Sequence, residues 1–316
     1  MNTTENPLRI GYIGVGLMGH GAAKNIVTKG YPLTVYDPYA KDNVRDLVDR
    51  GATEASSAAD LASKSDVVFL NLPSSQDVEQ IVYGADGLLS ATRPGMIIVD
   101  STTADPRITR KIGADLAARS VQMIDAPNGR TPKEIEAGKV STYVGGSKEA
   151  IDRVMPVFST YADTIIRTGD LGSGTTMKLV NNFITIGTGA LIAEAVATAH
   201  QLGVDLKILV EVLSAGGANS VMFQWMKPWI VEGDDSHLQG PFRIAAKDIK
   251  LYARLADSAP AMSILATAVV QIYQLALIQG HANENLPVLP GILAELNGSH
   301  FTSIKDRDSE ASAGKT

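Results

Sequence analysis

The chain contains no cysteine, only two tryptophans and few aromatic residues of any kind, 5% in all. The absence of cysteine excludes disulfide bonds, thiolate metal sites and a cysteine nucleophile. The five histidines show no spacing typical of metal ligands; they are His20, His200, His237, His281 and His300. We therefore expect no metal site.

The sequence also lacks a basic block and a long apolar run. Its net charge is −6, whereas a nucleic-acid surface requires clustered lysine and arginine. The apolar segment 187–199 is interrupted by Glu194, which predicts a buried helix instead of a membrane span. The first residues, MNTTENP, have neither the basic nor the apolar region of a signal peptide. We therefore expect a cytoplasmic protein with no nucleic-acid or membrane partner.

The composition is that of a globular protein with a large core: 316 residues, 45% hydrophobic and 20% charged. This length predicts two domains. The sequence pattern divides the chain into residues 1–170, in which apolar runs alternate with helical segments, residues 171–300, which are helical, and a polar tail, residues 301–316. We expect the tail to be flexible.

Short apolar runs alternate with helical segments in the first domain. The predicted strands are 8–13, 33–36, 66–72, 96–99, 123–125 and 141–144, and the predicted helices are 19–29, 41–50, 57–63, 76–82, 106–118 and 148–159. This alternation predicts a doubly wound, mostly parallel sheet of the Rossmann type. After about Gly172 only helices are predicted: 175–202, 206–215, 223–232, 243–256 and 262–280. The second domain is therefore expected to be all α.

Three glycines follow the first apolar run: Gly14, Gly16 and Gly19. Their order after a strand and at the start of a helix is typical of a dinucleotide-binding turn. In such turns the first glycine permits the sharp bend, the second lets the pyrophosphate approach and the third lets helix and strand pack closely. The amides at the helix N-terminus then face the phosphates.

Asp37 ends the second apolar run, about 20 residues after the glycines, where an acidic residue binds the adenosine ribose. A carboxylate there accepts hydrogen bonds from the ribose hydroxyls and repels the 2′-phosphate of NADP, which predicts NAD as the cofactor. The alternative is that Asp37 only opens a turn with Pro38. Lys41 is the nearest basic residue.

Further polar residues and turns follow the later strands. Leu72 ends the third predicted strand and Pro73 follows it, Thr103 comes after the fourth strand, and Asp125 ends the fifth. Because parallel strands end at one edge of a sheet, where ligands bind, these positions are expected to contribute to a single site.

One helical face near the domain junction is polar. Lys178, Asn182 and Thr185 are spaced i, i+4 and i+7, and Asn181 borders the same face. A face that packs in a core would be apolar, so we interpret this one as a site. A lysine in a partly dry cleft can exchange a proton with an alcohol or carbonyl oxygen. The alternative is a solvated lysine without a chemical role.

Five motifs in order resemble the β-hydroxyacid dehydrogenase family, from about Arg9 to about Ala294. They are GVGLMG, DSTTADP (Asp100–Pro106), DAPNGRT (Asp125–Thr131), GSGTTMKLVNN and the pair Lys247-Asp248. The resemblance implies a Rossmann domain, an all-helical domain and a cleft between them. It also implies hydride transfer to or from NAD, and dimers or tetramers formed through the helical domain.

The resemblance further assigns roles to individual residues. Lys178 is implied to donate and accept the proton, and Asn182 to support both Lys178 and the substrate. The residues implied to contact NAD, beside the glycines, are Leu17, Met18, Asp37, Leu72, Thr103 and Lys247.

The chain departs from the family pattern after Asp-Ala-Pro. Most members have a Ser-Gly-Gly turn there, whereas this chain has Asn128 followed by Gly129, Arg130 and Thr131. The Gly-Arg-Thr turn is similar to that of the branch that includes 3-sulfolactaldehyde reductase. An arginine fork suits an anionic group, which Asn181 and Thr185 would also face. The alternative is that Arg130 is a solvated loop residue.

The preferred substrate pair is accordingly 3-sulfolactaldehyde and 2,3-dihydroxypropane-1-sulfonate. A carboxylate substrate, such as 3-hydroxyisobutyrate or tartronate semialdehyde, is the alternative within the same mechanism. A non-catalytic NAD-binding module is the alternative of another class, although such a module would have no need of the Lys178 and Asn182 pair.

Overall fold

The computed structural model describes residues 7–259 and 262–307, and the chain divides into two compact units, Met1–Lys178 and Leu179–Thr316. Helix α8 (Ser173–Gln201) contains the boundary between the units. Each unit has its own hydrophobic core, so the two are described separately.

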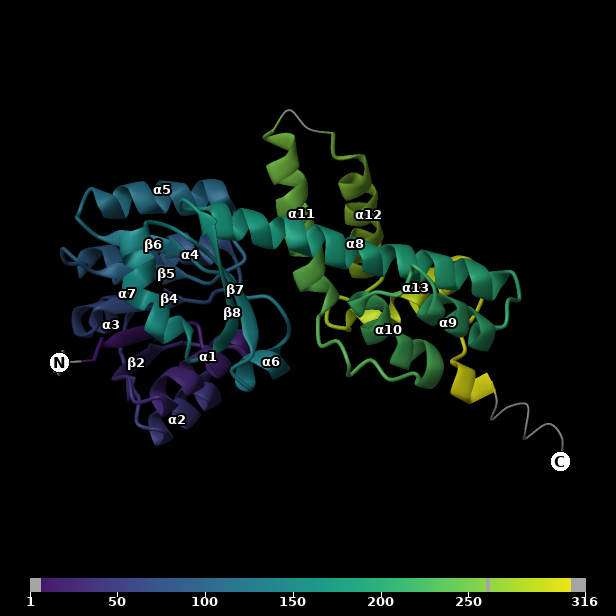
Figure 1. The fold of residues 1–316 in the computed structure, drawn as a ribbon, viewed down its shortest axis with the longest axis horizontal. Coiled ribbons are helices and arrows are strands. Elements are labelled where there is room, and N and C mark those ends of the chain that lie inside the picture. Colours follow the sequence, from purple (N-terminus) through teal and green to yellow (C-terminus); the bar gives the residue numbers. More distant parts are fainter. Residues whose placement is uncertain (1–6, 260–261, 308–316) are drawn as a thin grey trace. The chain divides into compact units, whose positions relative to one another are not determined.

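The first unit contains an eight-stranded sheet (Figure 1). In spatial order its strands are β3 (Thr53–Glu54), β2 (Leu33–Tyr36), β1 (Ile10–Ile13), β4 (Val67–Leu70), β5 (Ile97–Asp100), β6 (Gln122–Asp125), β7 (Val140–Gly145) and β8 (Ala162–Gly169). Neighbouring strands are parallel except β6 and β7, which are antiparallel. The predicted doubly wound, mostly parallel sheet is confirmed.

Helices cover both faces of this sheet because the strands alternate their side chains between two cores. Val67 and Phe69 of β4 point into one core, and Val68 and Leu70 into the other. The first core includes side chains from α1 (Leu17–Thr28), α2 (Lys41–Asp49), α6 (Pro132–Glu136) and α7 (Lys148–Phe158). The second includes side chains from α3 (Ala58–Lys64), α4 (Ser75–Tyr83) and α5 (Pro106–Ala117).

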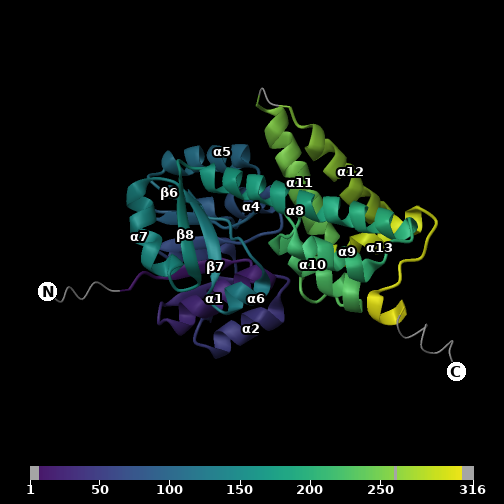
Figure 2. The ribbon, with the colours of Figure 1, turned by 45° about the vertical axis from the view of Figure 1, so that its right-hand side comes forward.

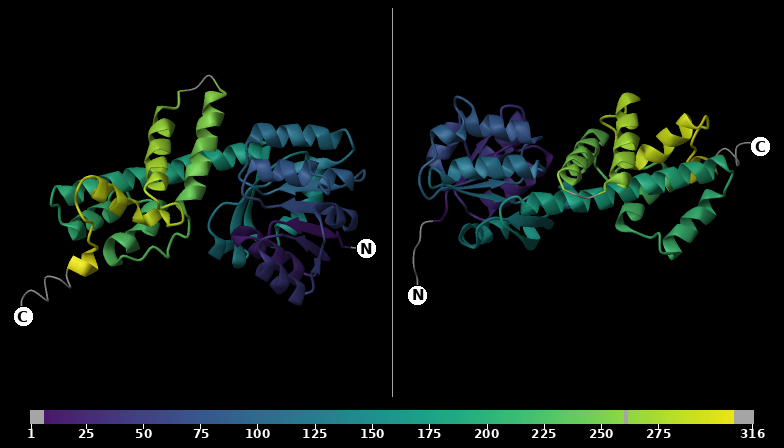
Figure 3. Two further views of the ribbon diagram at one scale, coloured as in Figure 1. Left: turned by 180° about the vertical axis from the view of Figure 1, so that it is seen from behind. Right: turned by 90° about the horizontal axis from the view of Figure 1, so that it is seen from above.

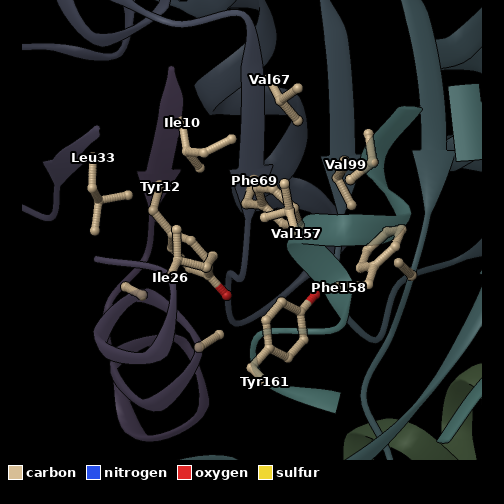
Figure 4. Packing of buried hydrophobic residues seen from close by; sticks show 14 of the residues in the cluster. Ile10, Tyr12, Ile26, Leu33, Val67, Phe69, Val99, Val157, Phe158 and Tyr161 are labelled. Carbon is tan, nitrogen blue, oxygen red and sulfur yellow. The ribbon is translucent and has the colours of Figure 1, made fainter. Parts of the chain in front are cut away.

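Aromatic side chains fill the centre of the first core (Figure 4). The rings of Tyr12 and Phe69 are stacked with centroids 5.6 Å apart, and Phe158 and Tyr161 meet Phe69 edge-on. The Tyr12 and Tyr161 hydroxyls point inward in the same region, and burial raises the pKa of both phenols. This core packs against β1 and β4, and so it supports the glycine turn that follows β1.

The second unit is formed by helices, as predicted. After α8 come α9 (Leu206–Ala215), α10 (Val221–Glu232), α11 (Phe242–Asp257), α12 (Ile264–Ile278) and α13 (Leu289–Leu296). Its described residues form no β-strand, only an isolated bridge between Pro241 and Asn285. Helices α11 and α12 lie side by side (Figures 2 and 3), and Phe242 and Tyr273 are buried between helices of this unit.

Helix α8 is long and apolar. By length and composition it could cross a membrane, with a mean hydropathy of 1.4 over an 18-residue window that is 44% buried. Core helices of globular proteins have the same properties, and Ala190, Ala193 and Val196 of α8 belong to the packed clusters of the second unit. These contacts agree with the prediction of a buried helix.

The described part of the expected tail packs on the helical unit. Phe301 and Ile304 are buried in a cluster with α8, α9 and α10, and the Phe301 ring stacks on Trp229 with centroids 4.8 Å apart. These two apolar side chains pack residues 301 and 304 on the helical unit, and the flexibility of the tail stays a prediction. Residues 308–316 lie outside the described residues.

Candidate active site

The glycine turn between β1 and α1 has the geometry that the motif predicts. Gly14 adopts φ of +88°, and a Cβ at Gly19 would lie only 1.9 Å from the Gly14 carbonyl oxygen. Around Gly16, by contrast, a Cβ would meet nothing within 4 Å, and Gly16 is the N-cap of α1 without a capping side chain. The first amides of an α-helix lack intrahelical partners. This end of α1 therefore fits a phosphate group.

The two glycines are expected to respond differently to substitution. Gly19→Ala forces a Cβ into backbone and should lower the free energy of unfolding by about 1–3 kcal/mol, the usual range for overpacking. Gly16→Ala should leave that free energy unchanged but weaken NADH binding, because its methyl group projects into the space proposed for the pyrophosphate. Chemical denaturation and NADH titration of both variants measure these effects. Equal loss of stability in both would contradict this interpretation.

Leu17 and Met18 begin α1 directly after the open glycine. The Leu17 side chain is 68% exposed, whereas Met18 packs partly against the first core. Exposure of a large apolar side chain at this position is compatible with the prediction that Leu17 contacts a ligand.

Asp37 lies beside the glycine turn and is only 7% exposed. Its Oδ2 accepts a hydrogen bond from the Val15 amide at 2.9 Å, which joins the end of β2 to the turn after β1. Its Oδ1 accepts the amides of Tyr39 at 2.8 Å and Ala40 at 3.0 Å, so the turn that we considered as an alternative is also present. A carboxylate has about four acceptor sites, and these bonds leave capacity for a ribose hydroxyl.

The positive charge of Lys41, the basic residue nearest to Asp37 in sequence, is balanced by a neighbouring carboxylate. Its Nζ forms an ion pair with Glu54 Oε1 at 3.1 Å. The Lys41 ammonium is therefore paired with a carboxylate other than that of Asp37.

The predicted residues at the ends of β4 and β5 lie next to the glycine turn. A Cβ on Gly14 would be 3.1 Å from Leu72 Cδ2, and the Leu72 amide donates to Thr102 Oγ1 at 3.0 Å. Thr103 follows Thr102 and is half-buried, and Pro73 is exposed. This arrangement follows from the register of the sheet, because Leu70 at the end of β4 lies opposite Asp100 at the end of β5. The structure thus places Leu72 beside Gly14 and joins it to Thr102, the residue before Thr103.

Arg130, in the loop after β6, is held by protein partners. Arg130 adopts φ of +64°, which is rare for residues other than glycine. Its Nη1 bonds to Asp163 at 2.9 Å and to the Lys139 carbonyl, and its Nη2 to Thr164 at 3.3 Å. Hydrogen bonding from Arg130 lowers the pKa of Asp163. Arg130 is therefore paired with an acidic side chain of its own unit in this structure.

The neighbours of Arg130 are also engaged. The Gly129 amide donates to the Ser141 carbonyl at 2.7 Å. Thr131 begins α6 in a capping box, in which its amide donates to Glu134 at 3.1 Å and its hydroxyl bonds to the same carboxylate. Asn128 is buried, and neither its amide nitrogen nor its amide oxygen has a hydrogen-bond partner among the described residues.

Helix α8 carries Lys178 and the polar residues that follow it. Lys178 is the last residue of the first unit, and Asn182 and Thr185 follow on the same helical face in the second. Lys178 and Thr185 are half-buried, whereas Asn181 is exposed. Asn182 is buried, and its Nδ2 donates to Asp248 Oδ2 at 2.7 Å. With its NH₂ group engaged, Asn182 presents its oxygen as an acceptor.

Asp248, to which the sequence analysis assigned no role, contacts two of the predicted site residues. It is 4% exposed in α11, and its Oδ1 also pairs with Lys247 Nζ at 3.1 Å. One buried carboxylate thus orients both Asn182 and Lys247, two of the predicted site residues. Its position directly after Lys247 in the fifth motif is the sequence feature that could have indicated this role. Among residues 7–259 and 262–307, no group of three or more His, Cys, Asp or Glu side chains could hold a metal ion.

Two family matches cover most of the chain. Residues 9–169 match the family described as the NAD binding domain of 6-phosphogluconate dehydrogenase. Residues 172–287 match the family described as NAD-binding of NADP-dependent 3-hydroxyisobutyrate dehydrogenase. The first match covers the unit with the glycine turn, and the second covers Lys178 and the helices that follow it.

Individual relatives match over nearly their whole length. The chain is 31% identical to the NAD-dependent L-serine dehydrogenase of Pseudomonas aeruginosa, covering 92% of this chain and 99% of that protein. It is 29% identical to the 3-sulfolactaldehyde reductase of Escherichia coli, covering 87% and 92%. The mitochondrial 3-hydroxyisobutyrate dehydrogenase of Bos taurus is also 29% identical, covering 87% and 84%.

Solved structures share the fold. A 3-hydroxyisobutyrate dehydrogenase from Salmonella typhimurium superposes with a TM-score of 0.80 at 26% identity, covering 90% of this chain and 99% of that one. Together with the glycine turn, the Lys178 helix and the buried Asn182–Asp248 pair, these matches show that the chain belongs to the β-hydroxyacid dehydrogenase family. It is therefore an oxidoreductase that uses a nicotinamide dinucleotide, and the predicted cofactor class is confirmed.

Proposed function

We propose that this enzyme interconverts a short anionic β-hydroxy acid or alcohol and its aldehyde, with Lys178 as the proton donor and acceptor. One observation carries the proposal: Lys178 lies one helical turn before Asn182, whose amide is fixed by the buried Asp248 carboxylate. A lysine beside an oriented amide can hold and protonate one oxygen atom.

The proton and the hydride have separate sources in this scheme. When bound, NADH would supply the hydride in the direction of reduction, and NAD⁺ would accept it in the direction of oxidation. In the direction of reduction, the Lys178 ammonium donates a proton to the aldehyde oxygen, and in oxidation the neutral amine takes the proton from the alcohol. The Asn182 oxygen accepts a hydrogen bond from the ammonium or from the substrate hydroxyl. Lys247, which pairs with the same Asp248 carboxylate, is proposed to contact the cofactor.

NAD is proposed over NADP because of Asp37. Its buried carboxylate stands at the end of β2 beside the glycine turn, and Lys41 is paired with Glu54. A 2′-phosphate placed near that carboxylate would meet a like charge without a counterion. Leu17, Met18, Leu72, Pro73 and Thr103 are proposed to line the rest of the cofactor site.

The preferred substrate is 3-sulfolactaldehyde, with a carboxylate such as 3-hydroxyisobutyrate or tartronate semialdehyde as the alternative. Support for the sulfonate comes from the Gly129-Arg130-Thr131 turn and from the similarity to the Escherichia coli reductase. The relative named as an L-serine dehydrogenase supports the carboxylate class. In either case Arg130 would release Asp163 and bind the anionic group, with Asn181 and Thr185 as further contacts.

Substrate class can be tested with the absorbance of NADH and Arg130→Ser. We expect the wild type to reduce the sulfonate aldehyde faster than the carboxylate aldehydes. Arg130→Ser should lower kcat/KM for anionic aldehydes by about 10- to 100-fold, the usual loss of a charge-assisted hydrogen bond. Arg167→Ser is the matched control, because Arg167 pairs with Asp152 in the same unit outside the proposed site. Unchanged kcat/KM in Arg130→Ser would show that Arg130 does not bind the anion.

We also propose a cytoplasmic homodimer or homotetramer that forms through the helical unit. The exposed apolar side chains of this unit support the assembly, because large apolar patches mark protein interfaces. They include Ile184, Leu191, Ile208, Val212, Leu265 and Ile278. Sedimentation analysis should give a mass two or four times that of the chain, and a monomer at micromolar concentration would contradict this proposal.

A further inference from the structure

The carboxylate of Asp125 is buried at the N-terminus of the Lys178 helix. Asp125 is the last residue of β6 and has no exposed surface. Its Oδ1 accepts the Gly172 amide at 2.7 Å, and its Oδ2 accepts the Thr175 amide at 2.6 Å. Both bonds lie within the first unit. The carboxylate therefore satisfies two amides at the start of α8, which otherwise lack partners in a helix.

Glycines on two sides allow this close approach. A Cβ on Gly145 of β7 would lie 2.5 Å from Asp125 Oδ1, and a Cβ on Gly174 would lie 3.1 Å from Oδ2. Burial raises the pKa of Asp125, while the amides of Thr175 and Gly172 act in the opposite direction. The Asp125 carboxylate is therefore held by short hydrogen bonds from backbone amides, and its burial separates it from bulk water.

Two proposed functional segments meet at this residue. Lys178 is three residues after Thr175, on the same side of α8. The loop 126–131, with Gly129, Arg130 and Thr131, begins directly after Asp125. We propose that Asp125 is a positioning residue, which fixes the first turn of α8, and with it Lys178, relative to this loop. The inference rests on the proposed role of Lys178 as the proton donor.

Asp125→Asn tests the inference, because an amide NH₂ cannot accept one of the two backbone hydrogen bonds. We expect kcat to fall about 10- to 100-fold, the usual effect of losing a hydrogen bond to a charged group, while the Kd for NADH stays unchanged. Two controls separate positioning from general destabilisation. Val154→Ala removes buried volume from the first core, and Asp205→Asn removes the carboxylate cap of α9; both should retain kcat.

A second comparison distinguishes this inference from the function on which it rests. In a Lys178→Ala background, Asp125→Asn should cause no further loss of kcat, because coupled residues are not additive. If Lys178→Ala itself stays active, the proposed function fails. If Lys178→Ala is inactive but Asp125→Asn turns over at the wild-type rate, only the role of Asp125 fails.

Gly145→Ala keeps the inference testable if Asp125→Asn does not fold. The added Cβ displaces the same carboxylate from the β7 side and should also lower kcat with unchanged NADH affinity. A folded Gly145→Ala enzyme with the wild-type kcat would overturn the inference.

Discussion

Lys178→Ala is expected to lower kcat by about 10²- to 10⁴-fold, the contribution of a positioned general acid or base. The Kd for NADH should stay unchanged, because Lys178 is proposed to contact the reacting oxygen and not the dinucleotide. Lys178→Arg should be nearly as inactive, since a guanidinium stays protonated at neutral pH and cannot exchange the proton. Steady-state turnover and NADH fluorescence titration measure the two effects separately.

The matched control for this substitution is Lys64→Ala. Lys64 is in the first unit and pairs with Asp60 on the surface of α3, outside the proposed site. It should keep both turnover and NADH affinity. Turnover of Lys178→Ala at the wild-type rate would refute the assigned proton donor, whereas loss of NADH binding would instead place Lys178 at the cofactor.

Asp37→Asn is expected to lower the preference for NAD over NADP by about 100-fold. The variant loses the charge that repels the 2′-phosphate and weakens the acceptor for the ribose hydroxyls, and such charged hydrogen bonds contribute about 1.5–3 kcal/mol. The asparagine oxygen can still accept the amides of Tyr39 and Ala40, which preserves the turn after β2, whereas the hydrogen bond from the Val15 amide is lost because an NH₂ group cannot accept it. The ratio of kcat/KM for the two cofactors is the measurement.

Asp42→Asn removes an acidic charge nearby without touching the turn, because the Asp42 side chain is 94% exposed on α2. Its cofactor preference should equal that of the wild type. If Asp37→Asn also keeps the wild-type ratio, Asp37 serves only the turn after β2, and cofactor choice has another origin.

The central strands were predictable because each is an apolar run between turns. The strands β3 and β8 were missed: β3 has only two residues, and β8 mixes Ile165 and Ile166 with exposed polar residues such as Arg167 at the edge of the sheet. Helix α13 was missed because Pro290 and Gly291 interrupt its pattern, although proline is tolerated in a first helical turn. The short α6 was missed because it follows a loop motif directly.

The candidate site was predictable where its residues are neighbours in sequence. The glycine turn and the polar face of α8 follow from local spacing alone. The partners of these residues come from distant segments: Asp125 meets Gly172 and Thr175, and Asp248 meets Asn182. Sequence spacing does not specify such pairings, because the tertiary fold creates them. The same holds for Arg130, whose partner Asp163 belongs to β8.

The most direct measurement is a crystal structure of the protein with NAD and a short anionic hydroxy acid or unreactive analogue. The account predicts that Lys178 Nζ lies about 3 Å from the substrate oxygen that carries the exchanged proton, with the Asn182 amide beside it and the nicotinamide ring facing the adjacent carbon. A Lys178 ammonium directed into bulk solvent, with another side chain at that oxygen, would contradict it.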